Sequence, residues 1–130
     1  MSAVRSEAGK FSEAFAGFIC HVRPDRDVVY VAPEGELDLL TVGEVEQQLH
    51  ELRDAGFDQF VLDLRELTFI DLAGLRMAER WVAAARRDTF TFDVLTGAPA
   101  VQRLLHVLGG RHRLALNGDG ERREERGCRT

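Results

Sequence analysis

The chain has 130 residues, of which 45% are hydrophobic and 30% are charged, proportions typical of one globular domain. Its net charge of −5 argues against general nucleic-acid binding, because that function needs a basic surface. No apolar run approaches the ~20 residues that cross a bilayer, and the N-terminus lacks the long apolar core of a secretory signal.

The two ends of the chain differ in composition from the middle. The stretch 1–14 is small and polar with no sustained period, and we predict a flexible lead-in. The stretch 118–130 is densely charged with almost nothing apolar, and we predict a disordered tail. The folded domain is therefore expected to occupy 15–117.

The predicted domain begins with a hairpin and a helix. The apolar stretch 16–22 and the β-branched stretch 28–32 read as two strands joined by a proline-containing turn signal. Thr41 and Glu44 then have the spacing of a capping box. Apolar residues recur behind them at helical spacing, which predicts an amphipathic helix over 42–55.

The centre of the chain is an apolar strand over 59–64, a loop to Asp71 and a second helix over 73–87. One stripe of that helix should pack on the sheet: Leu75, Ala78, Val82 and Ala85. The opposite face carries arginines, and Leu72 at the helix entrance points roughly the same way. This face is either a solvated arginine surface or a docking surface with Leu72 as its apolar anchor.

The last predicted elements are a strand over 90–95, a helix that opens at Pro99, and a short strand over 114–116. The element order is therefore β-β-α-β-α-β-α-β. Alternation after the hairpin implies right-handed crossovers. We predict a single-domain α/β fold with a mixed, mostly parallel sheet of about five strands and helices packed on it.

Motifs for catalysis or cofactor binding are missing from the sequence. It has no Gly-rich phosphate loop, no Cys-x-x-Cys pair and no two histidines at metal-ligand spacing. Three carboxylates alternate in a way typical of a solvated strand face rather than of a metal site: Glu34, Glu36 and Asp38. Asp63 and Asp71 end predicted apolar segments, but no base or nucleophile accompanies them. We therefore predict no enzyme activity, no metal site and no cofactor.

The two cysteines indicate a reduced, cytoplasmic setting. Cys20 lies in a predicted strand and Cys128 in the predicted tail, which makes a poor disulfide framework. Cys20 is expected to be a small buried apolar residue rather than a catalytic thiol.

Four segments in order resemble a STAS domain, the module of bacterial anti-sigma-factor antagonists. They are 35–41, 60–64, 68–75 and 96–105. The first resembles the family's passage from strand to first helix, the middle two its signature strand, loop and helix, and the last its final strand-to-helix passage. The resemblance runs from about residue 16 to residue 117 and implies a STAS-like fold.

The chain departs from this family at the site of its phosphorylation switch. The family's loop reads Asp-Ser-Ser-Gly or similar, and a kinase that is also an anti-sigma factor phosphorylates the first serine. Here the loop reads Asp71-Leu72-Ala73-Gly74, so Leu72 stands at the phosphoacceptor position without an oxygen to phosphorylate. Either the domain binds a partner constitutively through Leu72, or the surface serves a different partner. The nearby hydroxyl of Thr68 is expected to be satisfied within the loop.

The resemblance implies a non-catalytic, regulatory protein-interaction domain similar to anti-sigma-factor antagonists. The predicted binding residues are Asp71, Leu72, Ala73 and Gly74, with Arg76 and Arg80 as the adjoining rim. Asp71 is expected to cap the helix, Gly74 to permit close approach and Leu72 to anchor the contact. The expected partner is an anti-sigma factor of the serine-kinase type. We expect no direct nucleic-acid contact and no membrane insertion, and homodimerisation is left open.

Two alternatives stay open beside this interpretation. The domain could be a cytoplasmic STAS subunit of a membrane transporter complex, for example in lipid transport. It could also be a small-molecule-sensing scaffold, since some members of the family bind ligands or nucleotides.

Overall fold

The sheet is organised around β2 (Val28–Leu37). β1 (Ile19–Asp25) pairs with it antiparallel as a hairpin. On the other side of β2, β3 (Gln59–Asp63) pairs in parallel with its first half, and β5 (Thr91–Leu95) pairs in parallel with β3. β4 (Leu67–Ile70) pairs in parallel with the last residues of β2, so the order is β1-β2-β3-β5 with β4 off this path.

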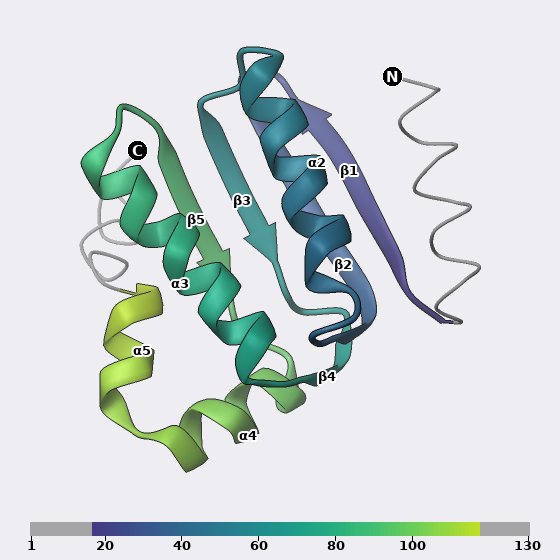
Figure 1. Ribbon diagram of the computed structural model, residues 1–130, viewed down its shortest axis with the longest axis vertical. Helices are drawn as coiled ribbons and strands as arrows, with labels where there is room; N and C mark the ends of the chain where they lie inside the picture. Colours follow the sequence, from purple (N-terminus) through teal and green to yellow (C-terminus); the bar gives the residue numbers. More distant parts are fainter. Residues whose placement is uncertain (1–16, 118–130) are drawn as a thin grey trace.

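Two long helices cover one face of this sheet. Figure 1 shows α2 (Val42–Asp54) and α3 (Leu72–Arg87) side by side on this face, running roughly along the direction of the strands. α4 (Pro99–Leu108) packs against β4, and α5 (Gly110–Asn117) packs against α3 and α4. The computed structural model describes residues 17–117. The predicted lead-in and tail lie outside the described residues, and the predicted domain start at residue 15 stays a prediction.

The hydrophobic core lies between the helices and the sheet. Alternate strand residues face it and are buried, among them Val29 and Val31 of β2, Phe60 and Leu62 of β3, and Phe92 of β5. The predicted stripe of α3 meets them, with Leu75, Ala78 and Val82 buried and Ala85 partly buried. Each fully buried large apolar side chain contributes roughly 1.5–3 kcal/mol of transfer free energy. The predicted fold class, a mixed and mostly parallel five-stranded sheet covered by helices, is confirmed.

The end of the domain corrects one predicted element. The stretch 114–116, expected as a short strand, is part of helix α5. Gly109 ends α4 with a positive φ of 95°, which glycine adopts without steric cost, and the chain starts a new helix at Gly110. Three apolar residues are too few for their spacing to distinguish a strand from a helix.

The strands also extend beyond their predicted bounds. β1 runs through the expected turn at Pro24, and β2 continues past Pro33 to Leu37. Proline's φ near −65° is compatible with extended backbone at a cost of one N–H donor. Residues 67–70, expected as loop, form β4. The fifth strand of the sheet is thus β4 rather than a C-terminal strand.

Gly35 marks the point where β2 changes its parallel partner from β3 to β4. Its φ is +112°, and the register shifts between Gly35 and Glu36. A Cβ at this position would collide with the backbone carbonyl of Gly17. Only glycine therefore fits here, and its backbone turns the end of β2 toward β4.

Candidate functional site

The Asp71 side chain links the start of α3 to the loop between β2 and α2, at the carboxyl end of the sheet. It is the N-cap of α3, and its Oδ1 accepts a hydrogen bond of 3.0 Å from the Gly74 N–H. Its Oδ2 accepts a second bond, of 3.3 Å, from the Leu39 N–H in the loop between β2 and α2. The predicted capping role is therefore present, and the same side chain ties the start of α3 to the end of β2.

We expect Asp71→Ala to lower the free energy of unfolding by about 1–2 kcal/mol, because both acceptors are lost. Asp71→Asn keeps an oxygen for the Gly74 N–H and should cost less than half as much. Urea unfolding of the two variants and the wild type measures the difference. Equal losses in both variants would mean that charge, rather than the cap, carries the effect.

Four exposed apolar side chains surround Asp71, and we call them the Leu72 patch. Their exposed fractions are 36% for Leu72, 46% for Phe69, 65% for Leu40 and 74% for Leu39. They come together because Leu37 and Ile70 are opposite each other in the β2–β4 register, so the chain segments that follow both strands leave the sheet side by side. An apolar cluster of this kind on a surface is typical of an interaction site.

The loop before α2 is held in a shape that turns Leu39 and Leu40 outward. Asp38 Oδ1 accepts from the Leu40 N–H at 3.0 Å. The Thr41 hydroxyl accepts from the Asp38 N–H at 2.9 Å and donates to the Glu36 carbonyl at 2.8 Å. The predicted capping box is therefore wrong in detail, since the Thr41 side chain makes no cap bond to α2. Its hydroxyl instead stabilises the loop that carries Leu39 and Leu40, which are two of the four patch residues.

The other predicted site residues divide between the patch and the interior. Ala73 is partly buried beside Leu72, and Arg76 is exposed one turn further along α3. Gly74 is buried, and a Cβ there would lie 2.9 Å from both the Leu37 carbonyl oxygen and Ile70 Cγ1. The close approach that Gly74 permits is thus internal, between α3 and the end of β2.

Arg80 belongs to a different surface feature. Its Nη2 donates to Glu46 Oε2 of α2 at 3.0 Å, which draws it into the groove between α2 and α3. Arg76 is therefore the arginine of α3 that adjoins the Leu72 patch. Helical spacing alone aligned Arg76 and Arg80 and could not show that the second one has a partner on another helix.

Three patch residues were absent from the predicted site. Phe69 belongs to an apolar run of the sequence, and Leu39 and Leu40 belong to the passage into the first helix. One signal was available in the sequence: two adjacent leucines in a loop between Asp38 and Thr41 cannot both point into one core.

The hydroxyl and carboxylate groups near the patch make structural contacts. The Thr68 hydroxyl donates to the Gly35 carbonyl at 3.2 Å, so it helps hold β4 against β2. Asp63, at the end of β3, is bound by Arg65, whose Nε donates to Oδ1 at 2.9 Å and whose Nη2 donates to Oδ2 at 3.0 Å. These Arg65 hydrogen bonds lower the pKa of Asp63 below its ordinary value, although burial opposes them.

Arg65→Gln should raise the pKa of Asp63 and reduce stability at neutral pH. A depressed carboxyl pKa contributes stability above the unfolded value of about 4, and this contribution is lost as the pH falls through the folded value. The difference in unfolding free energy between wild type and variant should therefore be small but present near pH 7 and smaller near pH 3. Urea unfolding at both pH values measures it, with Arg103→Gln on α4 as the control. A difference that does not change with pH would contradict the assignment.

Burial governs the chemistry of Cys20. The side chain is 8% exposed, and burial, followed by the negative charge of Glu44, raises the pKa of its thiol to about 12. A thiol of this kind is inert at neutral pH, because the thiolate is the nucleophile. Its predicted character as a small buried apolar residue is confirmed.

Two kinds of feature are absent from residues 17–117. In that part of the chain no three His, Cys, Asp or Glu side chains are grouped as metal ligands would be. None of its helices has the length and apolar character that a bilayer crossing requires.

Comparisons with known proteins agree with this fold. The family model described as "Mlab, STAS domain" matches residues 20–116. The chain is similar to the crystal structure of an anti-sigma factor antagonist from Mycobacterium paratuberculosis, with 25% identity, a TM-score of 0.58, and coverage of 71% of this chain and 78% of that one. It has the fold of a proposed anti-sigma factor antagonist from Thermotoga maritima, with 18% identity, a TM-score of 0.60, and coverage of 68% and 77%. The search of curated proteins gave no match.

Proposed function

This chain belongs to the STAS domain family, and from that premise we propose that it is a non-catalytic regulatory domain that binds an anti-sigma factor through the Leu72 patch. The observation that carries the proposal is the patch itself. Two of its apolar side chains come from the loop before α2, one from β4 and one from the first residue of α3, and Asp71 ties the loop to the start of α3. An anti-sigma factor antagonist is among the similar solved structures.

The composition of the patch suits a protein contact. Interfaces that form and dissociate have an apolar centre and a polar rim, and a few central side chains carry most of the binding free energy. Leu72 sits beside Asp71 at the centre, and Arg76 provides a guanidinium on the rim. Because the caps and turn bonds already hold the loops in shape, little conformational entropy is lost when a partner covers them.

The proposed contact is not switched by phosphorylation at Leu72, because leucine has no hydroxyl group. A phosphate in this place would bring about −1.5 to −2 charges to the entrance of a helix and remake the contact. The side chain at position 72 therefore stays neutral and apolar at all times. Binding would then be regulated by the amounts of the chain and its partner rather than by modification of this loop.

The direct test is isothermal titration calorimetry of the purified chain against each serine-kinase-type anti-sigma factor encoded in the same genome. We expect one of them to bind, with the same affinity before and after incubation with Mg-ATP. Mass spectrometry should find no phosphate on residues 68–75 after that incubation. Absence of binding to every candidate, or release on addition of ATP, would contradict the proposal. Affinity capture of a transporter permease from native cells would favour the alternative function.

A further inference from the structure

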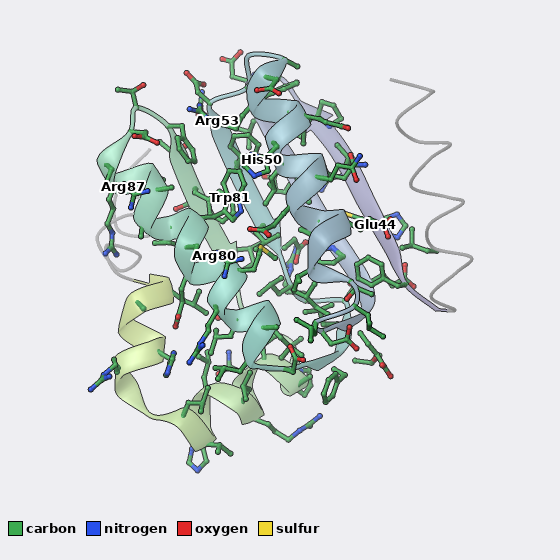
Figure 2. All side chains as sticks on the ribbon, in the orientation of Figure 1. Glu44, His50, Arg53, Arg80, Trp81 and Arg87 are labelled. Carbon is green, nitrogen blue, oxygen red and sulfur yellow. The ribbon has the colours of Figure 1, made fainter. Side chains whose placement is uncertain are left out.

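A groove separates the second halves of α2 and α3, away from the Leu72 patch at the other end of α3 (Figure 2). Its volume is about 680 Å³, within the range of 300–1,000 Å³ that is usual for small-molecule sites. Its floor is apolar and includes Phe57, Trp81, Ala84 and Phe90. Trp81 and Phe90 are each only 7% exposed, so the floor is part of the packed core rather than a mobile loop.

The aromatic floor is held rigidly. The indole ring of Trp81 stacks on Phe92 with a centroid distance of 5.7 Å and meets the edge of Phe90 at 6.2 Å. His50 of α2 lies over it at 4.9 Å. The indole N–H donates to Glu46 Oε2 at 3.2 Å. Because the ring is held on several sides, this part of the groove floor is preformed and does not rearrange when a ligand enters.

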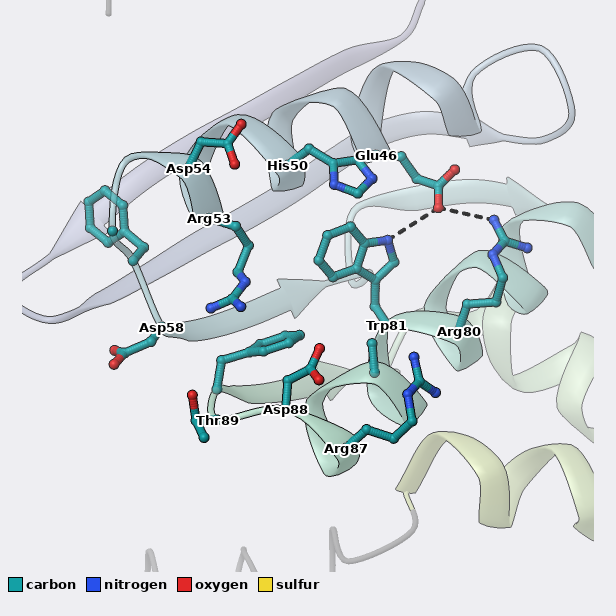
Figure 3. A pocket seen from close by; sticks show the side chains of 14 residues that line it. Glu46, His50, Arg53, Asp54, Asp58, Arg80, Trp81, Arg87, Asp88 and Thr89 are labelled. Carbon is teal, nitrogen blue, oxygen red and sulfur yellow. Dashed lines mark hydrogen bonds and ion pairs between the residues drawn. The ribbon is translucent and has the colours of Figure 1, made fainter.

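Positive charge gathers above this floor. Figure 3 shows the side chains of Arg53, Arg80 and Arg87 directed into the groove from α2 and α3. The guanidinium of Arg53 lies 4.1 Å from the centroid of the Phe90 ring, which leaves its N–H edge for a ligand. Among residues 17–117, Arg80 has an ion pair, with Glu46, whereas Arg53 and Arg87 have none.

The acidic residues of the groove do not cancel this charge. Glu46 already accepts from both Arg80 and Trp81. Figure 3 shows the carboxylates of Asp54 and Asp58 pointing away from the indole, so Asp88 is the remaining carboxylate that faces the groove. Because Arg80 and Glu46 pair with each other, Arg53 and Arg87 are left facing one carboxylate, that of Asp88, and the balance of one positive charge favours an anion.

We propose that this groove is a binding site for a small organic anion, with its apolar body against the groove floor and a carboxylate or phosphate group held by Arg53 and Arg87. Planar guanidinium groups suit both anions because they can donate two parallel hydrogen bonds. Glu46 holds the indole in place, and Arg80 closes the end of the groove nearest the start of the helices.

The chain contains a single tryptophan, so the indole N–H resonance of Trp81 in a ¹H–¹⁵N spectrum reports directly on the groove. The probes are naphthalene-2-carboxylate, its neutral isostere naphthalene-2-carboxamide, 2-naphthyl phosphate and inorganic phosphate. We expect the two naphthyl anions to shift the indole signal in a saturable way and to bind at least about 5-fold more tightly than the carboxamide. The naphthyl anion that binds more tightly shows whether the groove prefers a carboxylate or a phosphate group. Inorganic phosphate alone should bind at least about 10-fold more weakly.

Charge variants separate the proposed contacts from general attraction. Arg87→Gln should weaken binding of the tighter naphthyl anion by about 3-fold. The double variant with Arg53→Gln and Arg87→Gln should weaken it by about 10-fold. Neither variant should change the affinity for the carboxamide. Asp88→Asn should strengthen it, because a repelling carboxylate is removed. Arg76→Gln, on the same helix but outside the groove, is the matched control and should have no effect. Equal binding of carboxylate and carboxamide, an Arg76→Gln effect equal to that of Arg87→Gln, or an indole signal that does not move would overturn the proposal.

Discussion

Leu72→Asp is expected to weaken the proposed complex with an anti-sigma factor by at least about 100-fold, a loss of about 2.7 kcal/mol. The substitution places a carboxylate at the centre of an apolar contact, where burial of an unpaired charge is costly. The new charge would also lie beside Asp71, which already carries one. Calorimetric titration of the variant against the partner measures the loss.

The folded domain should tolerate this change, because the Leu72 side chain is already 36% exposed. We expect the unfolding free energy of the variant to lie within about 1 kcal/mol of the wild type. Val107→Asp on α4 provides the matched control, since Val107 is 77% exposed and lies outside the patch. If Leu72→Asp binds as tightly as the wild type, or if Val107→Asp loses as much affinity as Leu72→Asp, the patch is not the binding surface.

Gly35→Ala should produce the largest loss of stability, about 3 kcal/mol or more. The φ of +112° is strained for any L side chain, and the added Cβ would meet the carbonyl of Gly17, which is backbone and cannot rotate away. Relief would require β2 to turn differently at the point where it leaves β3 for β4. Urea unfolding monitored by the fluorescence of Trp81 measures the cost.

Gly43→Ala is the matched control for that experiment. Gly43 lies in the first turn of α2, and a Cβ there would meet nothing within 4 Å. Alanine is the better helix former by up to about 1 kcal/mol, so this variant should be neutral or slightly more stable. A similar destabilisation in both variants would show that the clash at Gly35 is not the cause.

The sequence predicted the elements whose apolar spacing is long and regular. The stripes of α2, α3 and α4 and the apolar runs of β3 and β5 each agree with their structural bounds to within one or two residues. The strand predicted over 114–116 was wrong, because three apolar residues are too few to show a period. β4 was not predicted as a strand, because its pairing with β2 is a long-range contact that the local sequence pattern does not encode.

The candidate site also has features that local sequence predicts and features that depend on long-range contacts. The Asp71 cap could be predicted, because a cap is a local arrangement of three or four neighbouring residues. The adjacent leucines indicate that one of Leu39 and Leu40 is exposed, but the exposure of both could not be predicted, since it results from turn bonds of Asp38 and Thr41 to the backbone. The position of Arg80 also required the structure, because its partner Glu46 lies 34 residues away on another helix.

The way in which the Leu72 patch is assembled has a consequence for protein synthesis in the cell. Its two halves are separated by about thirty residues and meet through the pairing of β4 with the end of β2 and through the bond from Leu39 to Asp71. A chain still emerging from the ribosome exposes the first pair of leucines before the second half has been made. A partner that recognises all four side chains together therefore engages finished copies and ignores nascent or misassembled ones.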